Sequence, residues 1–241
     1  FKIDPIDHIA FAYRFYEDKI GGNPLHHAGA FYVQDPSAML PVAAAKGIIW
    51  PGMRVFDMCA APGGKSIQIS EMLGEEGMII SRDLTWAKVD LIEENIARLG
   101  AEHIQAECQD ALVLVPEDIE SADVVIADLP CSGLGVIRKK PDIRYKDPDS
   151  MKDLPQLQKK ILCNQARYLK PGGTLIYSTC TLLREENEGV VEAFLEENRE
   201  FYLEPLDLPP VFPKNENGML ALVSGEYDTD GFFIARLRRK L

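Results

Sequence analysis

From residue 53 onward, short β-branched runs alternate with longer amphipathic stretches, and this alternation constrains the fold more than any other feature of the sequence. Strands that alternate with helices form βαβ units, whose strands pair in parallel. The pattern therefore predicts an α/β fold with a doubly wound, mostly parallel sheet. The predicted strands lie at residues 53–58, 78–81, 103–107, 123–127, 174–178, 219–223 and 232–237. We expect the last two of these seven strands to pair as a hairpin on the sheet edge.

The segments between the strands carry recognisable helix signals. The predicted helices cover residues 65–73, 87–99, 149–169 and 185–197. Gly100 follows the second of these helices as a C-cap. Asp35-Pro36-Ser37 has the pattern of an N-cap with Pro at the first helical position, which predicts a helix through Ala45. We expect residues 1–50 to form a short, mostly helical N-terminal extension and residues 51–241 to form one domain.

The chain is acidic overall but has two basic patches. It contains 38 Asp and Glu against 26 Lys and Arg, a formal charge of −12, which argues against a protein that coats nucleic acid by general attraction. Residues 131–146 nevertheless contain five basic residues and one acid, and residues 236–240 contain four basic residues. An anionic partner would therefore meet local patches. No apolar run approaches the ~20 residues that cross a bilayer, so no membrane partner is expected.

Cysteine and histidine usage indicates the compartment. The five cysteines are an odd number without a Cys-x-x-Cys pair, which fits neither a disulfide framework nor a zinc site. The four histidines lack metal-ligand spacing, so no metal is predicted. Unpaired thiols favour a reducing compartment, and the charged N-terminal residues do not resemble a signal peptide. We therefore expect a cytoplasmic protein.

A glycine-rich loop, Cys59-Ala60-Ala61-Pro62-Gly63-Gly64-Lys65, follows the first predicted strand. Small residues let the backbone approach a ligand and a helix N-terminus favours negative groups, so we expect a ligand here; a tight turn without a ligand is the alternative. The loop lacks the dinucleotide fingerprint Gly-x-Gly-x-x-Gly. It approaches a P-loop in Gly64-Lys65-Ser66, and Asp128 resembles a magnesium-holding acid, but Cys59 stands where the first glycine would be. A P-loop-like nucleotide hydrolase is therefore an alternative.

Acids and cysteines follow the other predicted strands. Asp83 and Asp110 close the second and third strands, where an acid can accept hydrogen bonds from ribose hydroxyls; solvated charges or helix caps are the alternatives. Cys131 and Cys180 follow the fourth and fifth strands, which usually lie side by side, so both thiols should line the crevice beside the glycine-rich loop. Nearby basic residues favour a thiolate. Small buried hydrophobic residues and a regulatory disulfide are the alternatives.

These motifs resemble the Sun (Fmu) family of RNA cytosine carbon-5 methyltransferases, and look most like the bacterial enzymes that modify 16S ribosomal RNA. The resemblance covers residues 29–233 and includes the stretch 31–37. It rests on Asp57-x-Cys59-Ala60-Ala61-Pro62-Gly63-Gly64-Lys65, Asp128-x-Pro130-Cys131-Ser132-Gly133, Ser178-Thr179-Cys180, Glu185-Glu186-Asn187 and Asp230-Gly231-Phe232-Phe233. It implies a class I (Rossmann-like) fold with a seven-stranded sheet, S-adenosylmethionine as cofactor and ribosomal RNA as partner of a monomer, with transfer RNA as the alternative substrate.

The resemblance also implies roles for single residues. The loop from Cys59 to Lys65 is implied to cradle the methionine part of the cofactor, Asp83 to hold the ribose and Asp110 to lie beside the adenine, with Asp128 also in the cofactor site. The implied catalytic residues are Cys180, Cys131, Asp128 and Lys65.

Cytosine chemistry explains why the implied set contains a nucleophile. Carbon 5 of cytosine is a poor nucleophile until a thiolate adds to carbon 6, which is the role implied for Cys180. Cys131 is implied to act in the release of the enzyme, and Asp128 to hydrogen-bond the cytosine edge. The implied RNA-binding residues are Arg138, Lys139, Lys140, Arg144 and Lys146, for which an ordinary solvated loop is the alternative.

The chain departs from the family pattern in two respects. Leu129 stands where the family usually has Ala, and the larger side chain is expected to alter the base pocket. The bacterial ribosomal enzymes usually carry an additional N-terminal RNA-binding helical domain, so we expect either a catalytic fragment or a target that is reached differently. A noncatalytic RNA-binding protein that keeps the fold and the cofactor is a further alternative, against which the complete motifs argue.

Overall fold

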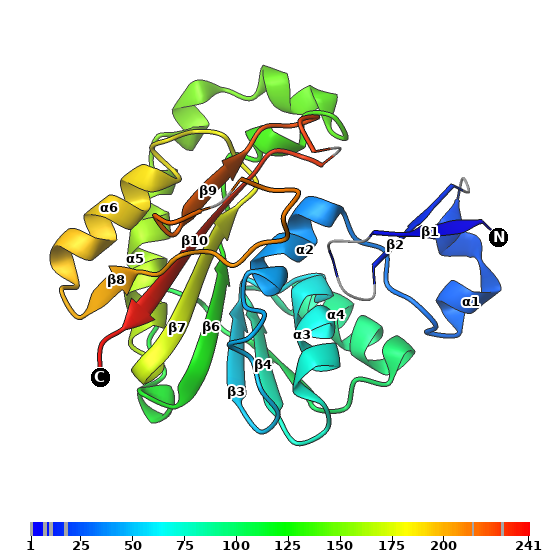
Figure 1. Cartoon of the computed structure of the whole chain (residues 1–241), viewed down its shortest axis with the longest axis horizontal. Coiled ribbons are helices and arrows are strands. Elements are labelled where there is room, and N and C mark those ends of the chain that lie inside the picture. Colours follow the sequence, from blue (N-terminus) through cyan, green and yellow to red (C-terminus); the bar gives the residue numbers. More distant parts are fainter. Residues whose placement is uncertain (1, 7–8, 10–11, 17–18, 214, 228) are drawn as a thin grey trace.

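The structure, a computed structural model, describes residues 2–6, 9, 12–16, 19–213, 215–227 and 229–241. Its centre is an eight-stranded sheet with helices on both faces (Figure 1). The strands of this sheet are β3 (Arg54–Met58), β4 (Met78–Asp83), β5 (Ile104–Cys108), β6 (Ala122–Asp128), β7 (Leu169–Thr179), β8 (Phe201–Leu203), β9 (Met219–Leu222) and β10 (Phe232–Arg239). A separate two-stranded sheet consists of β1 (Ile3–Pro5) and β2 (Tyr13–Phe15).

The α-helices are α1 (Pro24–His27), α2 (Pro36–Ala43), α3 (Gly64–Leu73), α4 (Trp86–Leu99), α5 (Leu154–Ala166) and α6 (Glu188–Glu197). Short 3₁₀ helices lie at Ile20–Gly22, Pro116–Asp118, Leu134–Val136, Pro141–Tyr145 and Pro148–Met151. None of the helices in the described part of the chain is long and apolar enough to cross a membrane.

The strand order β5-β4-β3-β6-β7-β10-β8 confirms the predicted doubly wound sheet. The chain moves outward from β3 to β5 and then returns to place β6 on the other side of β3, so the order reverses between β3 and β6. Strands β3 to β7 pair in parallel, and their carboxyl ends therefore share one edge. Ligands of such sheets bind in the crevice outside the carboxyl ends at the reversal. The fold thus places the glycine-rich loop, the acids and both candidate cysteines along one edge.

Beyond β7 the predicted hairpin of the last two strands is confirmed, because β9 and β10 pair antiparallel. Within this hairpin β10 is the inner strand, since it also pairs antiparallel with β7. Residues 232–235 of β10 also pair with β9, and residues 237–239 pair with β8, so two short strands share one position beside β10. The sheet therefore has eight strands where the sequence predicted seven. β8 has three residues, too few for an alternating pattern to be recognised.

Alternate side chains of the strands enter two separate cores, because successive residues of a strand point to opposite faces. In β3, Val55 belongs to the core that includes α2 and α3, whereas Phe56 belongs to the core that includes α5 and α6. Both side chains are fully buried. Burying a side chain of this kind typically stabilises a fold by about 1.5–3 kcal/mol. The two helical layers therefore hold the sheet from both sides.

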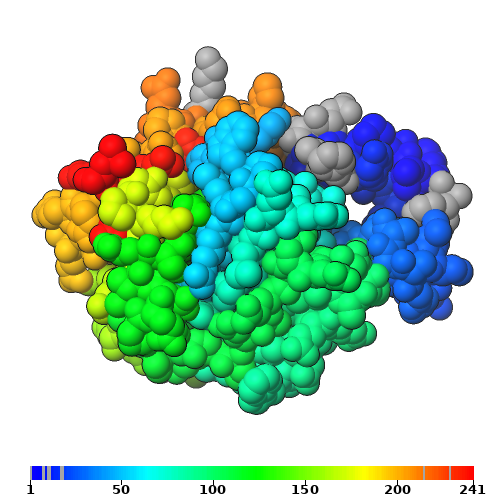
Figure 2. Space-filling model, turned by 90° about the horizontal axis from the view of Figure 1, so that it is seen from below, coloured from blue at the N-terminus to red at the C-terminus, as the bar shows by residue number. Residues whose placement is uncertain are grey.

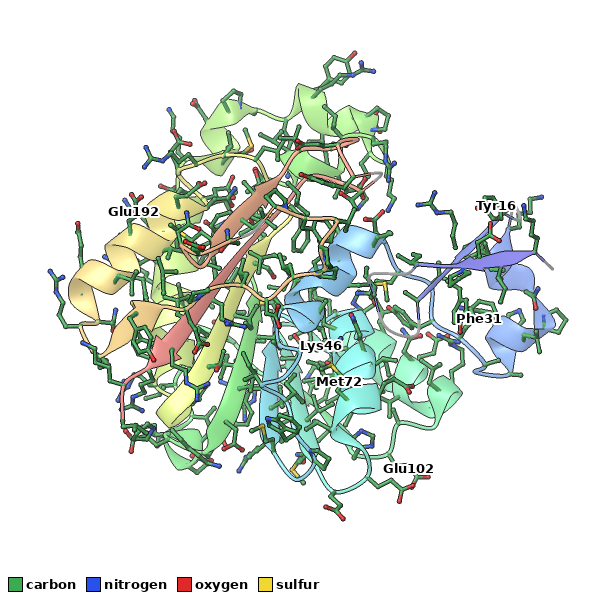
Figure 3. All side chains as sticks on the ribbon, viewed as in Figure 1. Tyr16, Phe31, Lys46, Met72, Glu102 and Glu192 are labelled. Atoms are coloured by element: carbon green, nitrogen blue, oxygen red, sulfur yellow. The ribbon has the colours of Figure 1, made fainter. Side chains whose placement is uncertain are left out.

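The N-terminal extension is not mostly helical, which corrects the prediction for residues 1–50. It contains the β1–β2 sheet as well as α1 and α2, and strands of three residues are too short to show a period in the sequence. β1, β2 and α1 project from one side of the molecule (Figures 1 and 2), whereas α2 packs in the core beside α3. Tyr16 and Phe31 lie in the projecting part (Figure 3). Arg98 of α4 holds it there by donating hydrogen bonds to the main-chain carbonyls of His26 and Phe31.

The helix ends follow the sequence signals at most positions. Asp35 caps α2, because its side chain accepts a hydrogen bond from the Ser37 amide at 2.9 Å. Gly100 ends α4 with a φ of 68°, in the left-handed region that favours glycine. The predicted helix at 149–169 is longer than α5, because a separate 3₁₀ helix precedes α5 and β7 already begins at Leu169.

Candidate active site

The glycine-rich loop turns sharply from β3 into α3. Cys59 has a φ of 62° and Gly63 a φ of 100°, both in the left-handed region. Glycine adopts this region without steric penalty, whereas Cys59 must be held in it by its surroundings. A Cβ atom on Gly64 would lie 2.8 Å from the ring of Tyr32, closer than real Cβ contacts come. The loop therefore packs directly against the N-terminal extension.

A buried carboxyl group lies at the base of the loop. Asp57 of β3 is fully buried, and its Oδ2 accepts a hydrogen bond of 2.5 Å from Ser66 Oγ. Ser66 Oγ also lies 2.6 Å from Ser81 Oγ in β4. Burial raises the pKa of Asp57 to about 6, although the Ser66 bond opposes this. Oδ1 of Asp57 is buried and has no hydrogen-bond partner within the described residues, so it can accept a bond from a ligand.

Asp83 and Asp110 lie at the strand ends where they were predicted, but Asp83 is already engaged. Its Oδ2 accepts a hydrogen bond from the Ala61 amide of the loop at 3.0 Å. Its Oδ1 accepts from the Leu84 amide at 2.7 Å and from Lys88 Nζ at 2.8 Å. In this arrangement Asp83 holds the glycine-rich loop against the end of β4. Asp110 caps a turn that follows β5.

Lys65 and Asp128 form an ion pair across the carboxyl ends of β3 and β6. Lys65 Nζ lies 2.5 Å from Asp128 Oδ2, and Ser178 of β7 donates a hydrogen bond of 2.7 Å to Oδ1. Burial lowers the pKa of Lys65, but Asp128 outweighs that effect and the net pKa is raised. Ser178 was not among the predicted site residues. Its place two residues before Cys180, on the same face of an extended chain, was the available signal.

The two candidate cysteines lie against each other. Cys131 Sγ and Cys180 Sγ are 3.1 Å apart, and both thiols are free. The hydrogen bond from Cys131 lowers the pKa of Cys180 against the effect of burial, and Lys65 lowers it further. The same bond, together with burial, raises the pKa of Cys131 well above its usual range. Within the pair, deprotonation is therefore easier at Cys180 than at Cys131.

Cys59 does not compete as a nucleophile, although it lies in the same crevice. Burial raises its pKa to about 12, and the neighbouring carboxylates of Asp83 and Asp128 add to this effect. The thiolate is the nucleophilic form of cysteine, so Cys59 is unreactive at neutral pH.

Main-chain contacts fix the loop that follows Cys131. The Gly135 amide donates to the Cys180 carbonyl at 2.9 Å, and the Gly231 amide donates to the Gly135 carbonyl at 2.8 Å. A Cβ atom on Gly135 would lie 2.1 Å from the Gly231 carbonyl oxygen. Only glycine fits at this crossing, which ties the loop to both β7 and β10.

Two of the five predicted RNA-binding residues are engaged in ion pairs. Lys139 pairs with Asp35 and, at 3.0 Å, with Asp230. Arg138 lies 3.7 Å from the carboxylate of Asp35 and 3.3 Å from that of Asp230. The side chain of Asp230 is 3% exposed, so this cluster is partly desolvated. It connects the N-terminal extension, the basic loop and β10.

The remaining predicted RNA-binding residues differ in their contacts. Lys146 donates a hydrogen bond of 2.7 Å to a main-chain carbonyl of the same loop. Lys140 and Arg144 are exposed, and the Arg144 guanidinium lies 5.1 Å from the ring centre of Tyr145. Lys140 and Arg144 can therefore approach a phosphate without breaking the ion pairs that Arg138 and Lys139 make with Asp35 and Asp230.

The basic patch at residues 236–240 is used internally. Arg236 pairs with Glu204 at 3.2 Å, and Arg239 pairs with Glu120 at 2.6 Å. This patch therefore stabilises the sheet edge. Within the described residues, no three His, Cys, Asp or Glu side chains are grouped in a way that could hold a metal ion.

The strand order, the glycine-rich loop at the reversal and the acids on neighbouring strand ends define the class of this protein. Solved S-adenosylmethionine-dependent methyltransferases share the fold. The chain has the class I, Rossmann-like methyltransferase fold. A sequence model of the family described as 16S rRNA methyltransferase RsmB/F matches residues 50–238. The chain belongs to this family.

Individual relatives agree with the family model. The chain is 38% identical over 226 residues to ribosomal RNA small subunit methyltransferase F of Escherichia coli O6:H1. This alignment covers 91% of this chain and 47% of that protein. The crystal structure of NSun6 from Pyrococcus horikoshii with SFG is 30% identical with a TM-score of 0.81, over 92% of this chain and 56% of that one. A methyltransferase homolog protein from Pyrococcus horikoshii is 29% identical with a TM-score of 0.82, over 100% and 78%.

These comparisons confirm the predicted family resemblance and the S-adenosylmethionine-dependent class. They do not favour the P-loop alternative, and the structure engages Lys65 with Asp128, the two residues that this alternative required for phosphate and magnesium. The chain spans about half the length of the curated relatives it matches.

Proposed function

We propose that this chain is the catalytic part of an RNA cytosine carbon-5 methyltransferase that acts on small-subunit ribosomal RNA in the cytoplasm. The observation that carries the proposal is the thiol pair of Cys131 and Cys180, 3.1 Å apart and next to the Lys65–Asp128 ion pair. The family model and the 38% identity to a ribosomal RNA small subunit methyltransferase support ribosomal RNA as substrate.

The residues at the end of β3 fit S-adenosylmethionine. When bound, this cofactor supplies a methyl group on a positively charged sulfur. The buried, unpartnered Oδ1 of Asp57 suits a cationic donor of such a ligand, and the carboxylates of Asp83 and Asp128 make the same edge acidic. Residues 59–65 would cradle its methionine part, with Asp83 near the ribose and Asp110 near the adenine.

Cys180 opens the reaction as a thiolate. Its sulfur forms a bond to carbon 6 of cytosine, and the electron pair of the 5,6 double bond makes carbon 5 nucleophilic. Asp128 hydrogen-bonds the cytosine edge, and Lys65 holds the Asp128 carboxylate in place. The target base must be unstacked or flipped to reach this crevice, which suits an RNA loop.

Cys131 acts in the release of the enzyme. Its pKa is raised by the hydrogen bond to Cys180, by burial and by the charge of Cys180. Once Cys180 is bonded to carbon 6 its charge is gone, so the thiol proton of Cys131 is lost to solvent more easily. After carbon 5 has gained the methyl group that the cofactor would supply, the Cys131 thiolate takes the carbon-5 proton, the electron pair of that bond restores the 5,6 double bond, and the bond between carbon 6 and Cys180 breaks to restore the thiolate of Cys180.

Methyl transfer to RNA tests this proposal. The chain is incubated with methyl-labelled S-adenosylmethionine in two parallel reactions. One contains a bacterial 16S ribosomal RNA transcript and the other a transfer RNA pool. We expect label in the 16S transcript as 5-methylcytosine. Label in the transfer RNA alone would identify transfer RNA as the substrate in place of ribosomal RNA. Binding of S-adenosylmethionine without transfer to either RNA would support the noncatalytic alternative.

Cysteine variants test the assigned roles. Cys180→Ala should abolish transfer while S-adenosylmethionine binding, measured by titration calorimetry, stays intact. Cys163→Ala on α5 is the matched control and should transfer normally. Cys131→Ala should trap a covalent RNA adduct, visible as a shifted band in a denaturing gel, and the double Cys131→Ala and Cys180→Ala variant should lack it. Transfer by Cys180→Ala would refute the nucleophile assignment.

A further inference from the structure

Glu186 is a buried carboxylic acid beside the two cysteine turns. It is 1% exposed, and its Oε1 has no hydrogen-bond partner within the described residues. Leaving a buried polar atom unpaired costs about 1–3 kcal/mol. Glu186 is followed by Asn187, which is also 1% exposed and directly precedes α6. Burial of two consecutive polar side chains is unfavourable unless their hydrogen bonds compensate for it, so the partners of Glu186 and Asn187 indicate what these residues do.

Glu186 holds the turn that carries Cys131. Its Oε2 accepts a hydrogen bond of 2.9 Å from the Ser132 amide and one of 2.8 Å from Gln158 Nε2. Gln158 Nε2 also donates to the Pro130 carbonyl at 3.0 Å. The residues on both sides of Cys131 are therefore fastened through one carboxylate oxygen and one amide group.

Asn187 holds the turn that carries Cys180 in the same manner. Its Oδ1 accepts a hydrogen bond of 2.6 Å from Thr179 Oγ1, and its Nδ2 donates to the Thr181 carbonyl at 3.1 Å. The residues on both sides of Cys180 are thus also fastened. The hydroxyl groups of Ser132 and Thr181, 2.6 Å apart, join the two turns directly.

The backbone between these two side chains is itself anchored. Tyr177 of β7 is fully buried, and its hydroxyl donates a hydrogen bond of 2.5 Å to the Glu186 carbonyl. Because Glu186 and Asn187 are adjacent in the chain, both cysteine turns are hydrogen-bonded to the same short, anchored segment of backbone. The separation of the two sulfur atoms is then set by this segment and not by the flexibility of either loop.

We propose that Glu186 and Asn187 are positioning residues that set the distance between the Cys131 and Cys180 sulfur atoms. Glu186 acts on Cys131 and Asn187 on Cys180, and neither touches the substrate. This inference rests on the proposed function, in which Cys131 must donate a hydrogen bond to Cys180. The two thiols therefore have to stay within hydrogen-bond distance. The contact joins two residues of this chain, so the inference can be tested by a measurement that uses neither RNA nor cofactor.

Alkylation of Cys180 by iodoacetamide provides the test, followed by mass spectrometry of the Cys180 peptide over a range of pH. The thiolate is the reactive form, so the rate reports whether Cys131 still donates its hydrogen bond. Glu186→Leu removes the acceptor for the Ser132 amide. We expect alkylation severalfold slower at pH 7.5 and a profile displaced to higher pH. The other charged groups that act on Cys180, Asp128 and Lys65, are unchanged.

Matched variants separate positioning from general damage. Glu185→Leu makes the same substitution at the exposed neighbouring residue and should leave the alkylation profile unchanged. Glu186→Gln keeps one carbonyl oxygen in the position of Oε2 and should restore most of the rate. If Glu186→Leu does not fold, Gln158→Met takes its place, because it removes the bond to the Pro130 carbonyl from α5 and should shift the profile in the same direction.

An alkylation profile of Glu186→Leu that coincides with those of wild type and Glu185→Leu would overturn the inference. So would a Glu186→Gln variant as slow as Glu186→Leu, because the accepting oxygen would then not be the cause. If the variants behave as expected but the wild-type chain methylates no RNA, the positioning role stands and the proposed function fails. The two hypotheses are therefore decided by separate measurements.

Discussion

Replacing Gly135 by alanine tests the close crossing of the loop after Cys131 with β10. The new Cβ atom would lie 2.1 Å from the Gly231 carbonyl oxygen and 2.8 Å from the Cys180 carbonyl oxygen, where real contacts stay above 3.0 Å. Both obstacles are backbone atoms, which cannot rotate away. The two chain segments must separate by about 1 Å, and overpacking of this kind typically costs about 1–3 kcal/mol.

The separation also weakens the two hydrogen bonds at the crossing, which join Gly135 to Cys180 and to Gly231 at 2.9 and 2.8 Å. Each bond contributes about 0.5–1.5 kcal/mol, so we expect Gly135→Ala to lower the free energy of unfolding by about 2–6 kcal/mol. For a domain of this size, about 2–4 °C is lost per kcal/mol, so the melting temperature should fall by roughly 4–24 °C.

Thermal and urea unfolding followed by circular dichroism measure this effect. Gly21→Ala is the control, because nothing lies within 4 Å of a Cβ atom there, and it should stay within about 0.5 kcal/mol of wild type. Gly231→Ala should lower the free energy of unfolding by an amount between those of Gly21→Ala and Gly135→Ala, because one of the groups that its Cβ atom would meet is the movable side chain of Leu182. If Gly135→Ala melts with Gly21→Ala, the crossing is not as tight as described and the reasoning is refuted.

Three further predictions concern charged residues. Asp57 has a folded-state pKa of about 6 against an ordinary value of 3.8, so its stabilising effect is complete below pH 3.8 and is lost as the pH rises through 6. Asp57→Asn should therefore gain stability relative to wild type as the pH rises from 4 to 7, by on the order of 3 kcal/mol; pH-dependent melts that remain parallel would contradict this. Arg82 is 4% exposed and pairs with two acids, so Arg82→Met should cost about 3–5 kcal/mol in urea unfolding. Lys139→Met should destabilise the fold and leave the salt dependence of RNA binding nearly unchanged, whereas Lys140→Met should do the reverse; filter-binding titrations at several salt concentrations decide this, and equal salt slopes for both variants would count against the distinction.

The parallel part of the fold could be predicted because its signals are local. β3 and β6 contain runs of buried apolar residues, and Gly100 and Asp35 mark helix ends through their own conformations. The edge beyond β7 could not be predicted in the same way. β8 is three residues long, and its pairing with β10 depends on contacts that no local pattern records. The N-terminal sheet was missed for the same reason.

The candidate site divides along the same line. The positions of Cys131 and Cys180 at the ends of neighbouring strands followed from the sequence, because parallel strands bring their carboxyl ends together. The networks around them did not. Glu186 meets Ser132 across 54 residues of chain, and Lys139 meets Asp35 across 104. Because the sequence does not show those contacts, it predicts Lys139 as an RNA-binding residue and does not distinguish Glu186 from the other acidic residues.

By itself, the sequence determined the class of fold, the edge of the sheet where the chemistry lies and the residue types that stand there, since periodicity and turn residues act over a few neighbouring positions. Only the tertiary structure decided which basic residues are engaged in ion pairs, which of the two thiols is the more acidic and how far apart they lie. Those properties depend on burial, charge and hydrogen bonds between segments that are distant in the chain, and they exist only once the sheet and its two helical layers are assembled.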